Sequence, residues 1–161
     1  MIYNAKGSVG FVGAKINWKG LNLAKIIEGV DLKNQPKTYR MDLINYYKEN
    51  ESSLFNEVNG NLKLENGIIQ MRDVKFSNSR ATGVLNLNYV KQTGNMTSEA
   101  KFVFIPVGER RAVDFTIRSN GNIVNPSVQF NFATLEKFID KTSTKEEKAQ
   151  YLRQQVQKSA S

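Results

Sequence analysis

The side chains that most often perform chemistry in proteins are sparse in this chain. Its 161 residues include no histidine and no cysteine, which removes the commonest general base and metal ligand together with all thiolate and disulfide chemistry. Serines are frequent, but no histidine can activate one and no GxSxG turn surrounds one. A serine activated by a lysine would need neither histidine nor cysteine, but no sequence pattern indicates such a pair. We therefore expect no catalytic residues and no enzymatic activity.

Motifs that bind phosphate or metal are also missing from the sequence. Gly7, Gly10 and Gly13 do not have the spacing of a GxGxxG loop, and no GK[ST] follows a glycine run. A metal site would have to use carboxylates alone. The closest acidic residues, such as Glu146 and Glu147, are typical of solvated surface charge. We expect no cofactor and no metal ion.

The formal net charge is +8, and lysine and arginine are scattered along the chain with a small cluster at Arg110 and Arg111. Positive charge favours phosphates, whether of nucleic acid or of anionic lipid. A base-stacking groove would mix aromatic and basic side chains on one face of a sheet. Here the phenylalanines lie with leucine and valine on the apolar face, and the basic residues lie on the opposite face. No nucleic-acid partner is therefore expected. No apolar run approaches the roughly 20 residues that span a bilayer. The first residues do not have the pattern of a secretory leader, but a mature fragment or a domain of a longer protein would look the same, so the compartment stays open.

The elements that position these side chains are predicted to be mostly strands. From Phe55 to Phe132 apolar and polar residues alternate in short runs, as in the run 58–65, and Asn or Gly breaks separate the runs. Period two is the spacing of a strand with one wet and one apolar face. Short connections favour antiparallel hairpins, and one turn is predicted at 120–122. A change of parity at Arg72–Asp73 predicts a β-bulge.

Helical spacing is predicted near both ends of the chain. A strand over 7–18 precedes a helix over 21–30 with Asn22 as its cap, and a second helix is expected over 38–50. A further helix follows Phe132, with Thr134 as its N-cap.

The predicted fold class is α+β, a curved and mainly antiparallel sheet that forms a groove, with short amphipathic helices near both ends. Residues 1–142 are expected to form a single domain, and residues 143–161 a polar, mostly helical tail.

The apolar face of this sheet has two interpretations. In the first, the helices and a folded-over sheet cover it completely as a core. In the second, part of it stays open as a hydrophobic groove for a ligand. If a groove is present, its lining is predicted from the alternating apolar positions. These are Leu62, Leu64, Leu85, Leu87, Phe102, Phe104, Phe115, Ile117 and Phe130.

The order of these motifs resembles the C-terminal region of AsmA-like proteins. The phrase from Leu54 to Ile69 is similar to the family's F-x-x-hydrophobic-x-G strand and following Asn-Gly turn. The strands at 72–78 and 83–87 and the closing phrase at 117–128 follow in the family's order, and the segment 16–23 is similar to its strand, glycine turn and helix start. The resemblance covers roughly residues 7–140, and the tail beyond Ser143 has no counterpart in it.

The resemblance implies a non-enzymatic module in cell-envelope biogenesis. AsmA-like proteins are periplasmic and are usually anchored in the inner membrane, and they are linked to outer-membrane assembly and phospholipid transport. It implies a phospholipid or other acyl-chain ligand, bound along an apolar β-groove by burial of its CH2 groups. The alternative is a scaffold that binds envelope assembly proteins through an exposed sheet edge.

Overall fold

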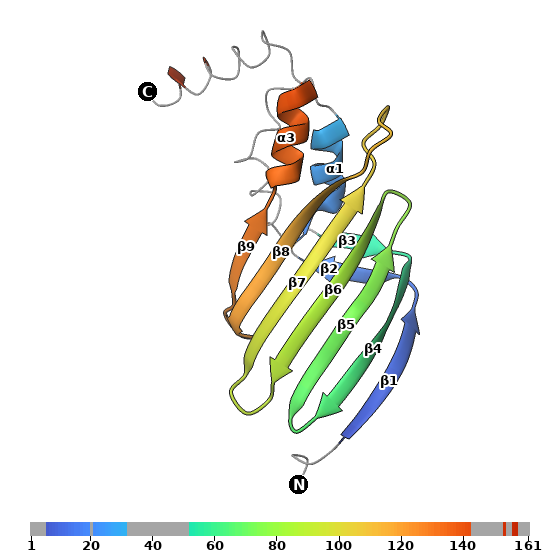
Figure 1. The fold of residues 1–161 in the computed structure, drawn as a ribbon, viewed down its shortest axis with the longest axis vertical. Coiled ribbons are helices and arrows are strands. Elements are labelled where there is room, and N and C mark those ends of the chain that lie inside the picture. The colour runs from blue at the N-terminus through green and yellow to red at the C-terminus, as the bar shows by residue number, and fades with distance from the viewer. Residues whose placement is uncertain (1–5, 20, 32–51, 143–152, 154–155, 158–161) are drawn as a thin grey trace.

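The computed structural model describes residues 6–19, 21–31, 52–142, 153 and 156–157. Within them, seven strands form one antiparallel sheet in the order β1-β4-β5-β6-β7-β8-β9, and β2 pairs with β3 beside it (Figure 1). The sheet is open and curved and has helices near both ends of the chain, so the predicted α+β class is confirmed. The elements are β1 (Lys6–Gly13), β2 (Ile16–Lys19), α1 (Leu23–Asp31), β3 (Ser52–Phe55), β4 (Glu57–Glu65), β5 (Ile68–Ser77), β6 (Ala81–Val90), β7 (Asn95–Phe104), β8 (Val113–Asn122), β9 (Ser127–Asn131) and α3 (Ala133–Thr142).

The predicted bulge is present in β5. The register of β5 against β6 shifts between Met71 and Val74. Asp73 adopts a φ of 50° there, and its N–H donates to Asn86 Oδ1 at 3.0 Å. On the other side of the bulge lies Gly60, where a Cβ atom would come within 2.7 Å of Val74 Cγ2. The bulge adds one residue to β5, so the odd-numbered apolar residues before it and the even-numbered ones after it point to the same side of the sheet. β5 therefore keeps one apolar face along its whole length.

The N-terminal elements agree with the prediction only in part. The strand predicted over 7–18 is two strands, because Lys15 adopts a φ of 61° and turns the chain out of the large sheet into β2. The helix predicted over 21–30 is present as α1, and Asn22 caps it by accepting from Lys25 N at 3.0 Å. The helix predicted over 38–50 lies outside the described residues, as does most of the tail 143–161.

Two predictions near the C-terminal end are wrong. The turn predicted at 120–122 is part of β8, and the chain reverses after Asn122, whose Oδ1 accepts from Val124 N at 3.0 Å. Thr134 is not the cap of α3, since that helix already includes Ala133. Phe132 occupies the cap position, because its carbonyl accepts the first helical bond from Glu136 N at 2.9 Å. One residue earlier, Asn131 Oδ1 accepts from Ala133 N at 3.1 Å. In both places an asparagine amide bonds the backbone two residues ahead.

A cluster of aromatic rings forms the centre of the core. Phe102 is 0% exposed, and its ring centroid lies 4.9 Å from that of Phe115, 5.4 Å from that of Phe76 and 5.7 Å from that of Trp18. Gly83 lies under the Phe76 ring, and a Cβ atom there would come within 2.1 Å of Phe76 Cε2. The core therefore joins the small β2–β3 sheet to the middle of the large one.

Ser53 links β3 to the start of α1 inside this core. Its buried hydroxyl accepts from Leu23 N at 2.8 Å and donates to the Leu21 carbonyl. We predict that Ser53→Ala lowers the free energy of unfolding by about 2–3 kcal/mol, because it leaves both backbone groups buried without a partner. Urea denaturation measures this loss.

The neighbouring serine provides the control for that measurement. Ser52 is exposed on the same strand, and Ser52→Ala should change stability by less than about 0.5 kcal/mol. Equal losses in the two variants would contradict a special role for the Ser53 hydroxyl.

Candidate functional site

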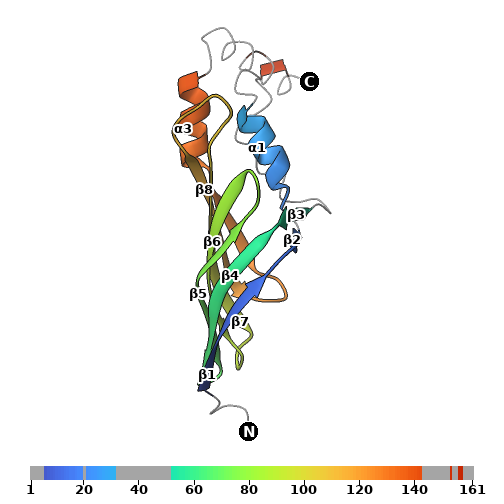
Figure 2. The ribbon, with the colours of Figure 1, turned by 90° about the vertical axis from the view of Figure 1, so that its right-hand side faces the viewer.

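The apolar face of the large sheet is divided into a covered half and an uncovered half. In the covered half lie the fully buried residues of β6, β7 and β8, against which β2, β3 and the two helices pack. Figures 1 and 2 show α1, α3, β2 and β3 gathered at one end of the sheet, and no described element lies over the apolar face at the other end. The same sheet thus presents both a closed core and an open apolar surface.

Strand register arranges the uncovered half into two rows that cross the sheet, which we call the open rows. Each member lies directly opposite the next one on the neighbouring strand. The first open row consists of Val9, Leu62, Met71, Leu87, Ser98, Ser119 and Val128. The second open row consists of Gly7, Leu64, Ile69, Tyr89 and Met96.

Water reaches the open rows directly. Val9 is 58% exposed, and the other apolar side chains of both rows are half-buried among their neighbours. In Figure 2, β1 and β4 bend toward the side on which α1, β2 and β3 lie, so the apolar side of the sheet is its concave side. Exposed apolar surface such as the run from Val9 through Leu62 and Met71 to Leu87 is typical of a binding site.

The structure separates the nine predicted lining residues into two sets. Leu62, Leu64 and Leu87 belong to the open rows, and Leu85 and Phe130 are partly buried at the border with the core. The others are at most 2% exposed and belong to the closed core: Phe102, Phe104, Phe115 and Ile117. Sequence reasoning did not select the remaining members of the open rows, although the alternation places several of them on the apolar face. The missing signal was the position of the cover, which local sequence does not contain.

A pair of lysines holds a carboxylate at the rim of the second open row. Glu65 Oε1 lies 3.0 Å from Lys6 Nζ, and Glu65 Oε2 lies 2.8 Å from Lys63 Nζ. These hydrogen bonds, first that with Lys63 and then that with Lys6, lower the pKa of Glu65 from 4.5 to about 2. The contact ties the edge strand β1 to β4 at the uncovered end of the sheet.

This ion pair gives stability a weak dependence on pH. Because the pKa of Glu65 is lower in the folded state, the pair stabilises the fold above about pH 4.5, and the contribution is lost as the pH falls to about 2. We expect Glu65→Gln to be less stable than wild type near neutral pH and equally stable at the acid end of this range. The difference should be small and should shrink with added salt, since all three side chains are exposed.

Titration of the Glu65 carboxyl carbon by NMR measures the shift directly. A midpoint near the unperturbed value would contradict the paired geometry.

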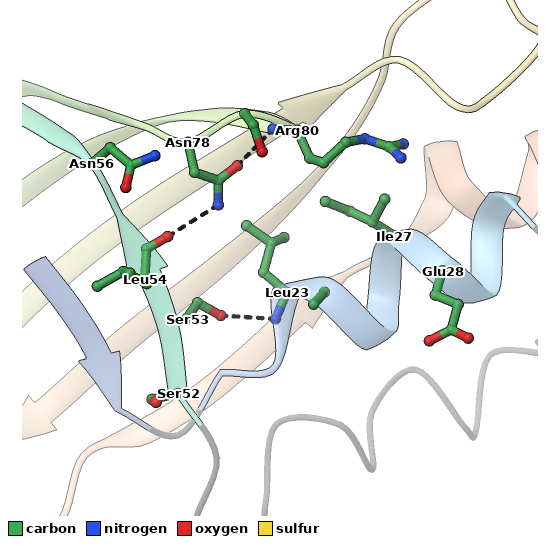
Figure 3. A pocket seen from close by; sticks show the side chains of 11 residues that line it. Leu23, Ile27, Glu28, Ser52, Ser53, Leu54, Asn56, Asn78 and Arg80 are labelled. Atoms are coloured by element: carbon green, nitrogen blue, oxygen red, sulfur yellow. Dashed lines mark hydrogen bonds between the residues drawn. The ribbon is translucent and has the colours of Figure 1, made fainter. Parts of the chain in front are cut away.

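A mixed pocket of about 550 Å³ lies between α1, β3 and the turn from β5 to β6 (Figure 3). Two of its polar side chains, Asn78 and Ser53, bond backbone groups of the pocket wall. Asn78 Oδ1 accepts from the backbone N–H groups of Arg80 and Ala81, both at 2.9 Å, and its Nδ2 donates to the Leu54 carbonyl at 3.2 Å. The Ser53 hydroxyl in its wall is likewise engaged. These bonds hold the pocket's walls together.

The opposite face of the large sheet is polar and has a hollow of about 530 Å³. Across it, Arg118 Nε donates to Glu99 Oε2 at 2.6 Å, and Asn86 is occupied by its bond from the Asp73 backbone. Within the described residues, no cluster of acidic side chains suits a metal ion. The described helices are each too short or too polar to cross a membrane.

Comparison with protein-family models, with curated proteins and with solved structures found no match.

Proposed function

We propose that this chain is a non-enzymatic module that binds the acyl chain of a lipid along the open rows. The observation that carries the proposal is the divided apolar face. The open rows continue the alternation of the core strands, yet no described element covers them. An acyl chain would supply the missing cover and exclude water from Leu62, Leu87 and their neighbours.

The dimensions of the rows suit such a ligand. Neighbouring strands lie about 4.8 Å apart, so the unbroken apolar part of the first open row, from Val9 on β1 to Leu87 on β6, is roughly 14 Å long. One leaflet of a bilayer has a hydrocarbon thickness of roughly 15 Å, so this part is about as long as an acyl chain within a leaflet. Each CH2 group buried there contributes about 0.8 kcal/mol. Met71 and Met96 add flexible side chains that adapt to chains of different shape.

The cellular role follows from the resemblance to AsmA-like proteins. We propose that the chain is the C-terminal module of an envelope protein whose parent is anchored in the inner membrane and faces the periplasm. Its task would be to guide phospholipid or another acyl-chain ligand during outer-membrane assembly or phospholipid transport. The open curved sheet with an apolar concave side supports this proposal, because a passive surface of this kind can pass a chain along without chemistry.

The test is mass spectrometry of lipids extracted from the purified protein. We expect phospholipid or fatty acid to copurify in an amount comparable to that of the protein. Finding none, from protein that also fails to bind an added fluorescent fatty acid, would overturn the proposal.

A second candidate function uses the edge strand β1. Within the described sheet β1 pairs with β4 alone, and the strand contains no proline and one charged residue, Lys6, at its end. Edges without such protection accept an extended peptide by strand addition. In this alternative the chain is a scaffold for envelope assembly proteins. A photoreactive residue in place of Val12, which is 89% exposed, would then cross-link to protein, whereas the lipid proposal predicts no such product.

A further inference from the structure

The loop that joins β7 to β8 exposes two large apolar side chains around a buried one. Ile105 is 54% exposed and Val107 is 62% exposed, whereas Pro106 between them is fully buried. Figure 1 shows that this loop extends beyond the end of the sheet on the side of the helices. Folding therefore anchors the loop by its proline and points its two neighbours toward solvent, where their exposure brings the fold no stability.

Several contacts fix the shape of the loop. The Glu109 N–H donates to the Pro106 carbonyl at 3.1 Å, and Gly108 adopts a φ of 80° that suits glycine. The Arg80 guanidinium lies 3.5 Å from the Ile105 carbonyl and donates to it. The apolar side chains are thus presented by a preformed turn, so little conformational entropy would be lost when they bind.

Positive charge surrounds the exposed apolar pair. Arg110 and Arg111 are exposed in the loop itself, which also contains the carboxylate of Glu109. The described residues hold no carboxylate in an ion pair with Arg110 or Arg111. Apolar side chains at a tip, with arginines behind them, match the interface of an anionic bilayer, which is apolar below and negatively charged at its surface.

We propose that the 105–111 loop docks on the surface of an anionic membrane. Ile105 and Val107 enter the boundary between headgroups and acyl chains, and Arg110 and Arg111 bind lipid phosphates. This site is separate from the open rows and does not depend on the proposed function. It gives the chain a fixed orientation on a lipid surface, with the helical end of the sheet toward the membrane.

Sedimentation with sucrose-loaded vesicles tests the proposal. The vesicles contain either phosphatidylcholine alone or phosphatidylcholine with about a third phosphatidylserine, a lipid mixture whose surface potential attracts basic residues. We expect binding to the anionic vesicles. Replacing both apolar residues (Ile105→Ser with Val107→Ser) should weaken binding roughly tenfold or more. Replacing both arginines (Arg110→Gln with Arg111→Gln) should weaken it about thirtyfold.

The matched controls are another exposed apolar turn and another pair of exposed cations. Ile123 and Val124, in the turn before β9, are 49% and 89% exposed, and Ile123→Ser with Val124→Ser should leave binding unchanged. Lys75→Gln with Lys91→Gln removes the same charge outside the loop and should weaken binding much less than the arginine pair does. Thermal melting of each variant confirms that it is folded.

Equal losses in the loop variants and their controls would overturn the proposal, because binding would then follow net charge alone. Absence of wild-type binding to anionic vesicles would also overturn the proposal. It would favour a protein as the partner of the exposed loop. Variants of the open rows should bind vesicles normally, so failure of the acyl-chain proposal remains distinguishable from failure of this one.

Discussion

Replacing Phe102 with alanine is expected to lower the free energy of unfolding by about 3–5 kcal/mol. Phe102 is 0% exposed, and its ring contacts Trp18 from β2, Phe76 from β5 and Phe115 from β8. Alanine would remove these contacts and leave a cavity that rigid neighbouring strands cannot fill. Since domains of this size are stable by about 5–15 kcal/mol, the variant should be close to unfolding. Urea denaturation measures the loss.

Phe130 provides the control for this prediction. It lies on the same face of the sheet but on the edge strand β9, where part of its ring is in water. Phe130→Ala should therefore cost less than half as much as Phe102→Ala. Similar losses in the two variants would mean that the covered half is not the main source of stability.

A double replacement in the first open row, Leu62→Asn with Leu87→Asn, is expected to weaken fatty-acid binding at least tenfold. Both leucines lie in register with Met71 between them, so the two changes interrupt the apolar row at two points. Full burial of a leucine side chain contributes about 1.5–3 kcal/mol; because these leucines are already half-buried without ligand, each asparagine would forfeit roughly half of that contribution. The variant should also lose some stability, because the leucines are half-buried and asparagine is unfavourable in strands, so thermal melting is used to confirm that it is folded. Fluorescence titration with a polyene fatty acid measures the affinity.

The matched control places the same substitution on the other face of the same sheet. Val84 and Val103 lie on the polar face of β6 and β7, each next in sequence to a residue of the apolar face. Both are half-buried. Val84→Asn with Val103→Asn should leave fatty-acid affinity unchanged. If both double variants bind as wild type does, the ligand does not use the open rows.

Much of the sheet could be predicted because its signals are local. Alternation within each strand depends only on neighbouring residues, and the parity change at Arg72–Asp73 was sufficient to predict the bulge. The predictions failed where a short segment could form either a turn or a strand. Asn120–Asn122 has the composition of a turn, but pairing of β8 with β7 extends through Asn122, so tertiary hydrogen bonds overrode the turn propensity.

The candidate site could be predicted only in part, for a different reason. Sequence places Leu87 and Phe102 on the same apolar face with the same pattern. Their environments differ because the β2–β3 sheet packs over one of them and not over the other. The covering residues, such as Trp18 and Phe55, are distant in the chain from the strands that they cover. How far they extend over the sheet depends on tertiary packing, which the local sequence pattern does not show. A periodicity can therefore identify an apolar face without showing where the core ends.

The position of β1 has a consequence for how the molecule assembles. From β4 to β9 every strand pairs with the next along the chain, so successive hairpins can build these six strands in order. By contrast, Lys6 pairs with Glu65 and Gly13 with Val58, and these contacts require a long segment of chain to close first. We expect β1 to join the sheet last, so that β4 is transiently an edge strand during folding. Chains that meet at this stage would be most prone to exchange their N-terminal strands.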